Sequence, residues 1–208
     1  MSRISHKYKF IFFSYPKTGS TSVRKLLDDY SDIHATTYKK RTAENPFYSH
    51  ITAAETKALF QERGWDYDSY FKFVVVRNPY TRLVSLYNMT ARKMPFSAWV
   101  KRLKPSGDGG CPFPDQKWKV HGAYSLLNFA GDGKRLLVDK VIKLGNLNAE
   151  LPIIFKQLGI PVPQQIPRSN IGSYGRKGRN WRSYYDQNLK RIVQKLYGWE
   201  LKEFHYNI

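Results

Sequence analysis

The sequence predicts an α/β protein: a three-layer, P-loop-like fold in which helices flank a central parallel sheet. Three observations predict it. Short runs of aromatic and β-branched residues recur along the chain, a polar turn follows each of the first two runs, and an amphipathic helix pattern follows each turn. This alternation is typical of parallel strands joined by crossover helices. With 208 residues, 41% of them hydrophobic, the chain is long enough for one packed domain, which we expect to span residues 1–208.

The first half of the chain contains two strand–turn–helix units. The strands are rich in Tyr, Phe, Ile and Val, and the helices carry apolar residues at helical spacing. Between the two units, Thr52 and Glu55 have the spacing of a capping box and predict a further helix. We therefore expect strands at 8–14 and 70–76, and helices from Thr52 onward, at 20–30 and at 80–92.

The second half is less regular and is divided by long loops. A third strand is expected at 138–144, followed by helices at 147–158 and 184–197. The Gly- and Pro-rich segment 105–114 and the segment 159–182, with four glycines, are expected to be loops. The polar segment 33–50 is expected to be either an ordered loop over a site or a flexible one.

The charge balance predicts an anionic partner. The chain has 35 Lys and Arg against 16 Asp and Glu, a formal net charge of +19. Such an excess favours nucleic acid, a phosphorylated nucleotide or an acidic polymer as partner. The single cysteine, Cys111, excludes an internal disulfide and leaves no thiol set for zinc, so no metal site is expected. No arginine follows Cys111 at the spacing of a phosphatase loop, so we interpret it as a lone loop cysteine.

No window of the sequence is apolar enough for a membrane span or a secretory signal. We therefore expect no membrane span in this chain and a cytoplasmic location, or the Golgi lumen if a natural precursor carries an anchor.

The first turn has the chemistry of a phosphate cradle. Backbone amides at a helix N-terminus bind anions, Gly19 lets the main chain approach closely, and Lys17 adds a movable positive charge. The alternative is a Ser/Thr-rich helix cap with an exposed lysine. A nucleoside-triphosphate P-loop is disfavoured because Lys17 precedes Gly19 instead of following it, and because the second strand ends in Arg77, where an aspartate would hold magnesium.

The second turn places an arginine at the carboxyl end of a strand, where open α/β sheets bind ligands. Arg77 can hold a phosphate with two hydrogen bonds, and Ser85, two turns into the next helix, can donate to the same group. The alternative for Arg77 is a surface ion pair. For Arg82 we weigh a nucleotide contact against an ion pair with an acid on the helix exterior, and favour the ion pair.

Both turns resemble a known family. Residues 15–22 (YPKTGSTS) are similar to the 5′-phosphosulfate loop of sulfotransferases that use 3′-phosphoadenosine 5′-phosphosulfate (PAPS). Residues 73–87 (FVVVRNPYTRLVSLY) resemble their 3′-phosphate motif, closest to the Golgi-type carbohydrate sulfotransferases. The resemblance implies PAPS as the donor, without a metal, with Arg77 and Ser85 at its 3′-phosphate. The residues implied at its 5′ end are Pro16, Lys17, Thr18, Gly19, Ser20, Thr21 and Ser22.

A third segment, 175–181 (GRKGRNW), resembles the loop that closes over the 3′-phosphate in several sulfotransferases. The resemblance implies nucleotide contacts from Arg176, Lys177 and Gly178, and the alternative is a solvated run of charge. Trp181 would either stack on adenine or anchor the loop in the core.

The resemblance also implies the catalytic roles. Lys17 would stabilise the leaving phosphate, and a histidine would take the proton of the acceptor. His50, before the capping box, and His121, before a possible substrate-binding helix, are the candidates, and Glu55 is a further one. The alternative for either histidine is a helix-capping role. His6 and His205 are expected to be structural or solvated, and His34 lies in the irregular segment 33–50.

The predicted function is thus sulfuryl transfer to a hydroxyl or amine, with a glycan as the expected acceptor. An anionic glycan is weakly favoured because the cations of 39–41 and 92–104 are not needed for the donor. Two alternatives remain at this point: a basic nucleic-acid-binding protein without catalysis, and a sulfotransferase-like fold that only binds the nucleotide. We expect no specific nucleic-acid partner, and the sequence does not indicate the oligomeric state.

Overall fold

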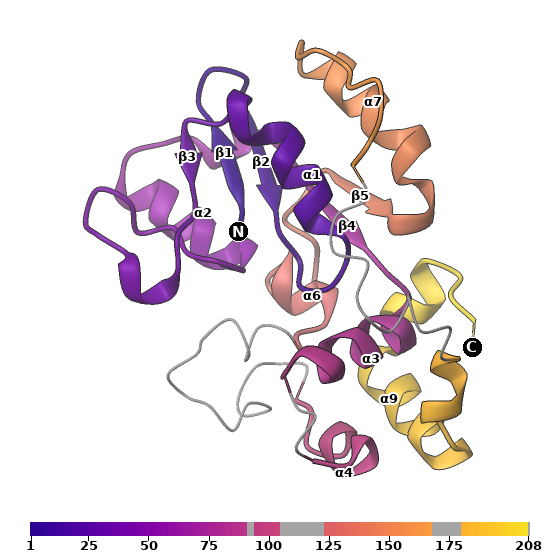
Figure 1. Cartoon of the computed structure of the whole chain (residues 1–208). Helices are drawn as coiled ribbons and strands as arrows, with labels where there is room; N and C mark the ends of the chain where they lie inside the picture. Colours follow the sequence, from indigo (N-terminus) through magenta and orange to yellow (C-terminus); the bar gives the residue numbers. More distant parts are fainter. Residues whose placement is uncertain (91–93, 105–122, 168–179, 208) are drawn as a thin grey trace.

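A computed structural model of the chain describes residues 1–90, 94–104, 123–167 and 180–207. Its centre is a five-stranded sheet with the order β3-β1-β2-β4-β5 (Figure 1). The strands are β1 (Arg3–Ser5), β2 (Phe10–Phe13), β3 (Ile33–His34), β4 (Phe71–Val76) and β5 (Lys140–Lys143). β2, β4 and β5 are parallel, whereas β1 pairs antiparallel with both β2 and β3. The predicted α/β class with a central parallel sheet is confirmed, with an antiparallel edge added.

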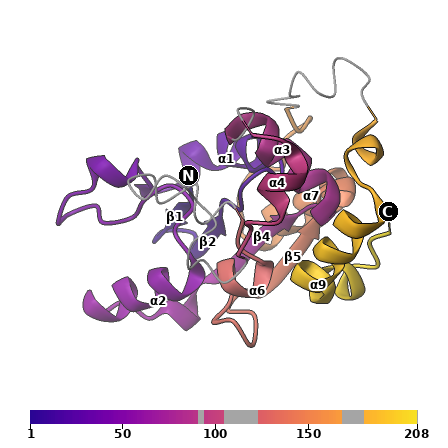
Figure 2. The ribbon, with the colours of Figure 1, turned by 90° about the horizontal axis from the view of Figure 1, so that it is seen from below.

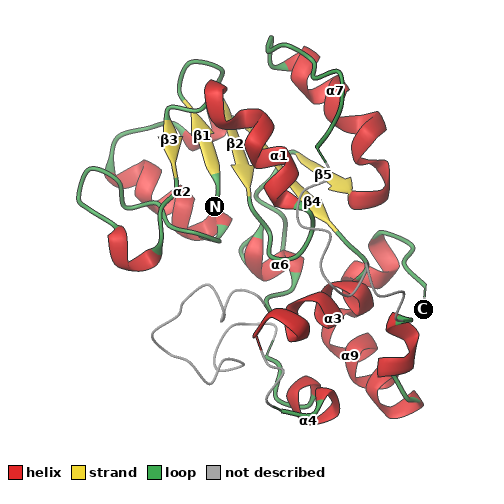
Figure 3. Ribbon diagram, in the orientation of Figure 1, coloured by secondary structure: helices red, strands yellow, loops and turns green. Residues whose placement is uncertain are grey.

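The helices surround this sheet, as Figure 3 shows. The capping box predicted at Thr52 is confirmed, because its hydroxyl accepts from the Glu55 amide and the Glu55 carboxylate accepts from the Thr52 amide, both at 3.2 Å. The α-helices are α1 (Ser20–Leu27), α2 (Ala53–Glu62), α3 (Pro79–Thr90), α4 (Phe96–Val100), α6 (Leu126–Phe129), α7 (Leu147–Gln157) and α9 (Gln187–Glu203).

Alternation along the strands builds the three layers. Phe10 and Phe12 of β2 pack with Val23 of α1 and Leu151 of α7 on one face. On the other face, Ile11 and its neighbours on that side of the sheet pack with residues of α2 and α6. Figure 2 shows the sheet between these two helix layers. A third apolar cluster joins α3, α4 and α9 beyond the carboxyl ends of the strands.

Several predicted boundaries differ from the observed ones. The expected helix 20–30 ends as an α-helix at Leu27 and continues as a 3₁₀ turn over Asp28–Tyr30. The last helix begins at Gln187 instead of 184 and runs to Glu203, past a non-helical residue at Tyr197. Within the described ranges, no helix is both long enough and apolar enough to cross a membrane.

Candidate anion-binding active site

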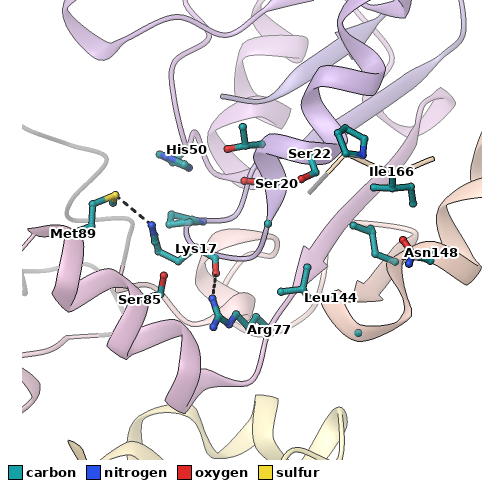
Figure 4. Close-up of a pocket in the computed structure, with 16 residues that line it drawn as sticks. Lys17, Ser20, Ser22, His50, Arg77, Ser85, Met89, Leu144, Asn148 and Ile166 are labelled. Atoms are coloured by element: carbon teal, nitrogen blue, oxygen red, sulfur yellow. Dashed lines mark hydrogen bonds between the residues drawn. The ribbon is translucent and has the colours of Figure 1, made fainter. Parts of the chain in front are cut away.

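A cavity of about 510 Å³ lies where the three parallel strands end. The turn after β2, Arg77 after β4 and Leu144 after β5 all reach it, which is the ligand-binding edge of an open α/β sheet. Figure 4 shows His50, Lys17 and Ser85 toward one end and Leu144, Asn148 and Ile166 toward the other. The lining consists of Pro16, Lys17, Gly19, Ser20, Thr21, Ser22, His50, Arg77, Ser85, Met89, Leu144, Gly145, Leu147, Asn148, Ile166 and Pro167.

The turn after β2 has an unusual backbone that brings the first turn of α1 to the cavity. Gly19 caps α1 in the left-handed region, with φ 79°. A Cβ at this position would lie 2.7 Å from Cδ1 of Leu144, so glycine is needed both for its conformation and for the close packing. The Thr18 hydroxyl is buried and donates to the Tyr15 carbonyl at 2.9 Å, so it supports the turn and does not line the cavity.

Lys17 directs its ammonium group along the cavity toward α3. Its Nζ lies 3.4 Å from Sδ of Met89, a weak acceptor (Figure 4). Burial lowers the pKa of Lys17, and the positive charge of Arg77 lowers it further. The site therefore brings together two cations whose mutual repulsion an anionic ligand would relieve.

Arg77 is held in place by the main chain of this turn and by its own helix. Its Nε donates to Oγ1 of Thr81 at 2.9 Å, and its Nη1 donates to the Lys17 carbonyl at 3.4 Å. Ser85 lines the same cavity from α3. The two residues predicted for one phosphate therefore lie on the same wall of the cavity.

His50 lies on the opposite side of the turn and is fixed by it. Its Nδ1 is 2.6 Å from the carbonyl oxygen of Ser14. Since a carbonyl only accepts, Nδ1 carries the hydrogen, and Nε2 is the basic nitrogen of the neutral ring. His50 (φ 62°) and Lys17 (φ 66°) are two of the four non-glycine residues with positive φ in the described part of the chain. Strained backbone of this kind is concentrated at functional sites.

The other predicted site residues divide into two groups. His121, Arg176, Lys177 and Gly178 lie outside the described residues. Glu55 does not line the cavity, because the capping box and the hydroxyl of Tyr48, 2.6 Å away, hold its carboxylate.

Trp181 and Arg82 do not belong to the described lining of the cavity. Trp181 stacks on Tyr80, with ring centroids 6.3 Å apart, and packs into the cluster of α3, α4 and α9, so it anchors the core. The exterior position expected for Arg82 is wrong, although an acid, Glu200, is among the charged groups that interact with it. Arg82 is completely buried, because α3 turns this face toward Tyr15 and Tyr197.

Sequence reasoning missed the far end of the cavity. Leu144 follows β5 directly, so its place after the third parallel strand was a usable signal. Met89, Asn148 and Ile166 carry no such signal, because an exposed helix residue or a loop residue looks the same whether or not it faces a ligand. In the part of the chain that the structure describes, no cluster of His, Cys, Asp and Glu could hold a metal ion.

The fold and the cavity define an α/β protein with a cavity at the carboxyl edge of its sheet, lined by Lys17, Arg77 and several hydroxyl groups. A model of the sulfotransferase family matches residues 1–207, nearly the whole chain. The protein therefore belongs to the sulfotransferase family and is a PAPS-dependent sulfotransferase. Family membership favours this enzyme over a nucleic-acid-binding protein without catalysis. No curated protein and no solved structure gives a significant match to the chain.

Proposed function

We propose that this enzyme transfers the sulfuryl group of PAPS to a hydroxyl or amine of a glycan, with His50 as the base and Lys17 stabilising the leaving phosphate. One observation carries the proposal: Lys17, His50 and Arg77, which are far apart in the sequence, line a single cavity. We also propose that residues 1–208 form one sulfotransferase domain. The role of His121 as an alternative base and the nucleotide contacts of residues 176–178 stay predictions, because these residues lie outside the described part of the chain.

The cavity fits the donor in charge and in size. Among the described lining residues there are two cations and five Ser, Thr or Asn side chains but no carboxylate, as suits a ligand with several anionic groups. Its volume lies within the range of roughly 300–1,000 Å³ that is usual for ligand sites. The first turn of α1 would hold the 5′ end, and Arg77 with Ser85 would hold the 3′-phosphate.

The chemistry follows from these positions. PAPS supplies an activated sulfuryl group and a phosphate leaving group. Nε2 of His50 would take the proton of the acceptor, and the Ser14 carbonyl keeps the ring in the tautomer that this requires. The ammonium group of Lys17 would donate to the oxygen on which negative charge develops. Lys17 must then leave the sulfur of Met89, a weak acceptor that offers little resistance.

The segment before His50 supports an acceptor with negative charge. Lys39 and Lys40 are exposed, and the guanidinium carbon of Arg41 lies 3.5 Å from the ring centroid of Tyr38. The amide of Ser49 donates to the Thr36 carbonyl at 2.6 Å beside the parallel bridge between Thr36 and Tyr48, so the loop that carries these cations closes just before His50. An anionic glycan bound there would reach the proposed base.

Two experiments test the donor and the acceptor separately. For the donor, we expect 3′-phosphoadenosine 5′-phosphate (PAP) to raise the melting temperature of the enzyme, and ATP with magnesium to leave it nearly unchanged. Arg77→Ala is expected to weaken PAP binding at least about tenfold by calorimetry, since it removes a bidentate charged contact. Arg135→Ala, an exposed arginine outside the cavity, is the matched control.

For the acceptor, labelled donor is offered with acidic polysaccharides, neutral glycans, lipids and small phenols. Label transferred to an acidic glycan supports the proposal, whereas transfer to phenols alone contradicts the glycan assignment. If PAP gives no stabilisation while DNA binds in a salt-sensitive manner, the enzyme assignment itself is contradicted.

A further inference from the structure

Among the described residues, the largest fully buried side chain does not line the cavity. Arg82 is on α3, five residues after Arg77, and none of its surface is exposed. Its guanidinium carbon lies 4.4 Å from the ring centroid of Tyr15 and 5.4 Å from that of Tyr197. Its Nη2 donates to the Tyr124 carbonyl at 3.0 Å. Arg82 thus contacts the residue that precedes the phosphate-binding turn.

The same carbonyl joins two parts of the site. The Tyr15 hydroxyl donates to the Tyr124 carbonyl at 2.6 Å, so Tyr15 and Arg82 share one acceptor. The ring of Tyr15 also stacks on Phe129, with centroids 4.8 Å apart. Since Pro16 and Lys17 follow at once, the position of this ring fixes where the turn leaves β2.

The last helix completes the arrangement. The hydroxyl of Tyr197 donates to the Ala123 carbonyl at 2.6 Å, and the buried carboxylate of Glu200 accepts from the Leu126 amide at 2.6 Å. Burial raises the pKa of Glu200, and the positive charge of Arg82 opposes this rise. We call Tyr15, Arg82, Tyr124, Tyr197 and Glu200 the Arg82 cluster.

The Arg82 cluster and Arg77 hold the turn from opposite sides. Arg77 donates to the Lys17 carbonyl from the cavity side, whereas Arg82 packs on Tyr15 from the interior. Both arginines belong to the same strand–helix junction. The wall that holds the 5′ end and the wall that holds the 3′-phosphate are therefore joined through α3.

A buried charged group is a costly way to stabilise a core, since apolar residues of similar volume often serve as well or better. What a buried guanidinium group provides and an apolar side chain does not is a set of directional hydrogen bonds, which fix the positions of the groups that accept them. We propose that Arg82 is a positioning residue: with Tyr15 and Tyr197 it sets the distance between the two phosphate-binding walls, and so determines the affinity for a nucleotide that carries both phosphates. This inference rests on the proposed function, because the nucleotide is the one assigned there.

The test compares hydroxyl deletions inside and outside the Arg82 cluster. Tyr15→Phe removes the hydrogen bond to the Tyr124 carbonyl and the polar contact with Glu200, and Tyr197→Phe removes the hydrogen bond to the Ala123 carbonyl and the polar contact with Arg82. Arg82→Lys keeps the charge but not the planar fork. Tyr67→Phe is the matched control, since Tyr67 is also buried and donates to a carbonyl, that of Leu137, at 3.0 Å, but at the other end of the sheet. Melting temperatures, and calorimetric affinities for PAP and for adenosine 5′-phosphate, are measured for each variant.

We expect Tyr15→Phe and Tyr197→Phe each to weaken PAP binding about fivefold or more, because each loses at least one buried hydrogen bond, and Arg82→Lys to weaken it about tenfold or more. Adenosine 5′-phosphate touches one wall only, so its affinity should fall less than that of PAP. Tyr67→Phe should lower the melting temperature without changing either affinity.

Three results would overturn the inference: unchanged PAP affinity in both tyrosine variants, an equal loss in Tyr67→Phe, or equal losses for PAP and adenosine 5′-phosphate. If Arg82→Lys does not fold, the two tyrosine variants decide. A wild-type enzyme that fails to bind PAP contradicts the proposed function instead, so the two failures are distinguishable.

Discussion

The cations at the two ends of the sheet have different surroundings. At the amino end, the ammonium group of Lys72 lies 3.1 Å from the carboxylate of Asp139 and donates to the Tyr70 carbonyl at 2.6 Å. At the carboxyl end, Lys17 faces Arg77, and the described lining of the cavity contains no carboxylate. The cation at the amino end is paired with a carboxylate of the protein, whereas the two cations at the carboxyl end are those that we propose bind the anionic donor. On this proposal the first charge serves stability and the second pair serves function.

The largest expected effect is on turnover, at the cavity end. His50→Ala should lower kcat about 100-fold or more, since general-base catalysis contributes roughly 10²–10⁴-fold, and should leave PAP affinity nearly unchanged. The assay is transfer of label from the donor to the acceptor found by the screen. His34→Ala, at an exposed histidine of β3, is the control and should keep full activity. Normal turnover in His50→Ala would remove His50 as the base.

The same substitution, lysine to methionine, at both ends of the sheet tests whether the two cations contribute differently to stability. Lys72→Met should lower the free energy of unfolding by about 1–3 kcal/mol, because it removes the ammonium donor of the Tyr70 carbonyl and the ion pair with Asp139, which then keeps the backbone amide of residue 72 as a donor. Lys17→Met should change it by less than about 0.5 kcal/mol or raise it, because it relieves repulsion with Arg77. Urea unfolding measures both. Equal losses at the two ends would contradict the distinction.

The tight turn is tested by two glycines with similar backbone conformation. Gly19→Ala and Gly64→Ala both place a side chain at positive φ, which costs about 1–2 kcal/mol. Only Gly19→Ala adds a clash, with Leu144 at 2.7 Å, whereas nothing lies within 4 Å of a Cβ at Gly64. Gly19→Ala should therefore lose more stability and also weaken PAP binding. The same PAP affinity in both variants would show that the contact with Leu144 does not shape the site.

The smallest change that we expect is the variation of stability and of PAP affinity with pH, through the charge of Lys17. The pKa of Lys17 is lowered in the folded protein, so between that value and its ordinary 10.5 the unfolded chain binds more protons. The contribution of Lys17 to stability therefore rises with pH in this window. PAP binding has the opposite sign, because the anion favours charged Lys17, and should weaken as pH rises through the lowered pKa. Calorimetry against pH, with Lys17→Met as a flat reference, measures this. A pH-independent affinity up to 10.5 would contradict it.

Sequence reasoning predicted the parallel core well because its signals are local and strong. A run such as FKFVVV is fully apolar on one side, and Pro79 follows three residues after its end, so strand and turn are both predicted directly. β1 and β3, with three and two residues, carry no such signal, since their strand character depends on pairing with β2 and with each other.

The candidate site was predictable from the sequence only where a motif coincides with the end of a strand. The two motifs placed Lys17 and Arg77 correctly at strand ends, because chemistry and position coincide there. The burial of Arg82 was not predictable, since on the sequence it reads as a polar residue on an amphipathic helix. The aromatic rings that its guanidinium group contacts belong to Tyr15 and Tyr197, which lie far from it in the sequence. Contacts of that range are set by the fold and not by local pattern.

A crystal structure of the enzyme with PAP tests the assignment of the cavity most directly. We expect the 5′-phosphate within hydrogen-bond distance of the first turn of α1 and Lys17, and the 3′-phosphate on Arg77 and Ser85. His50 should then face the 5′ end, where the acceptor would approach. Nucleotide bound outside this cavity, or with its 5′-phosphate on Arg77 and its 3′-phosphate at the first turn of α1, would show that these residues do not bind the donor as proposed.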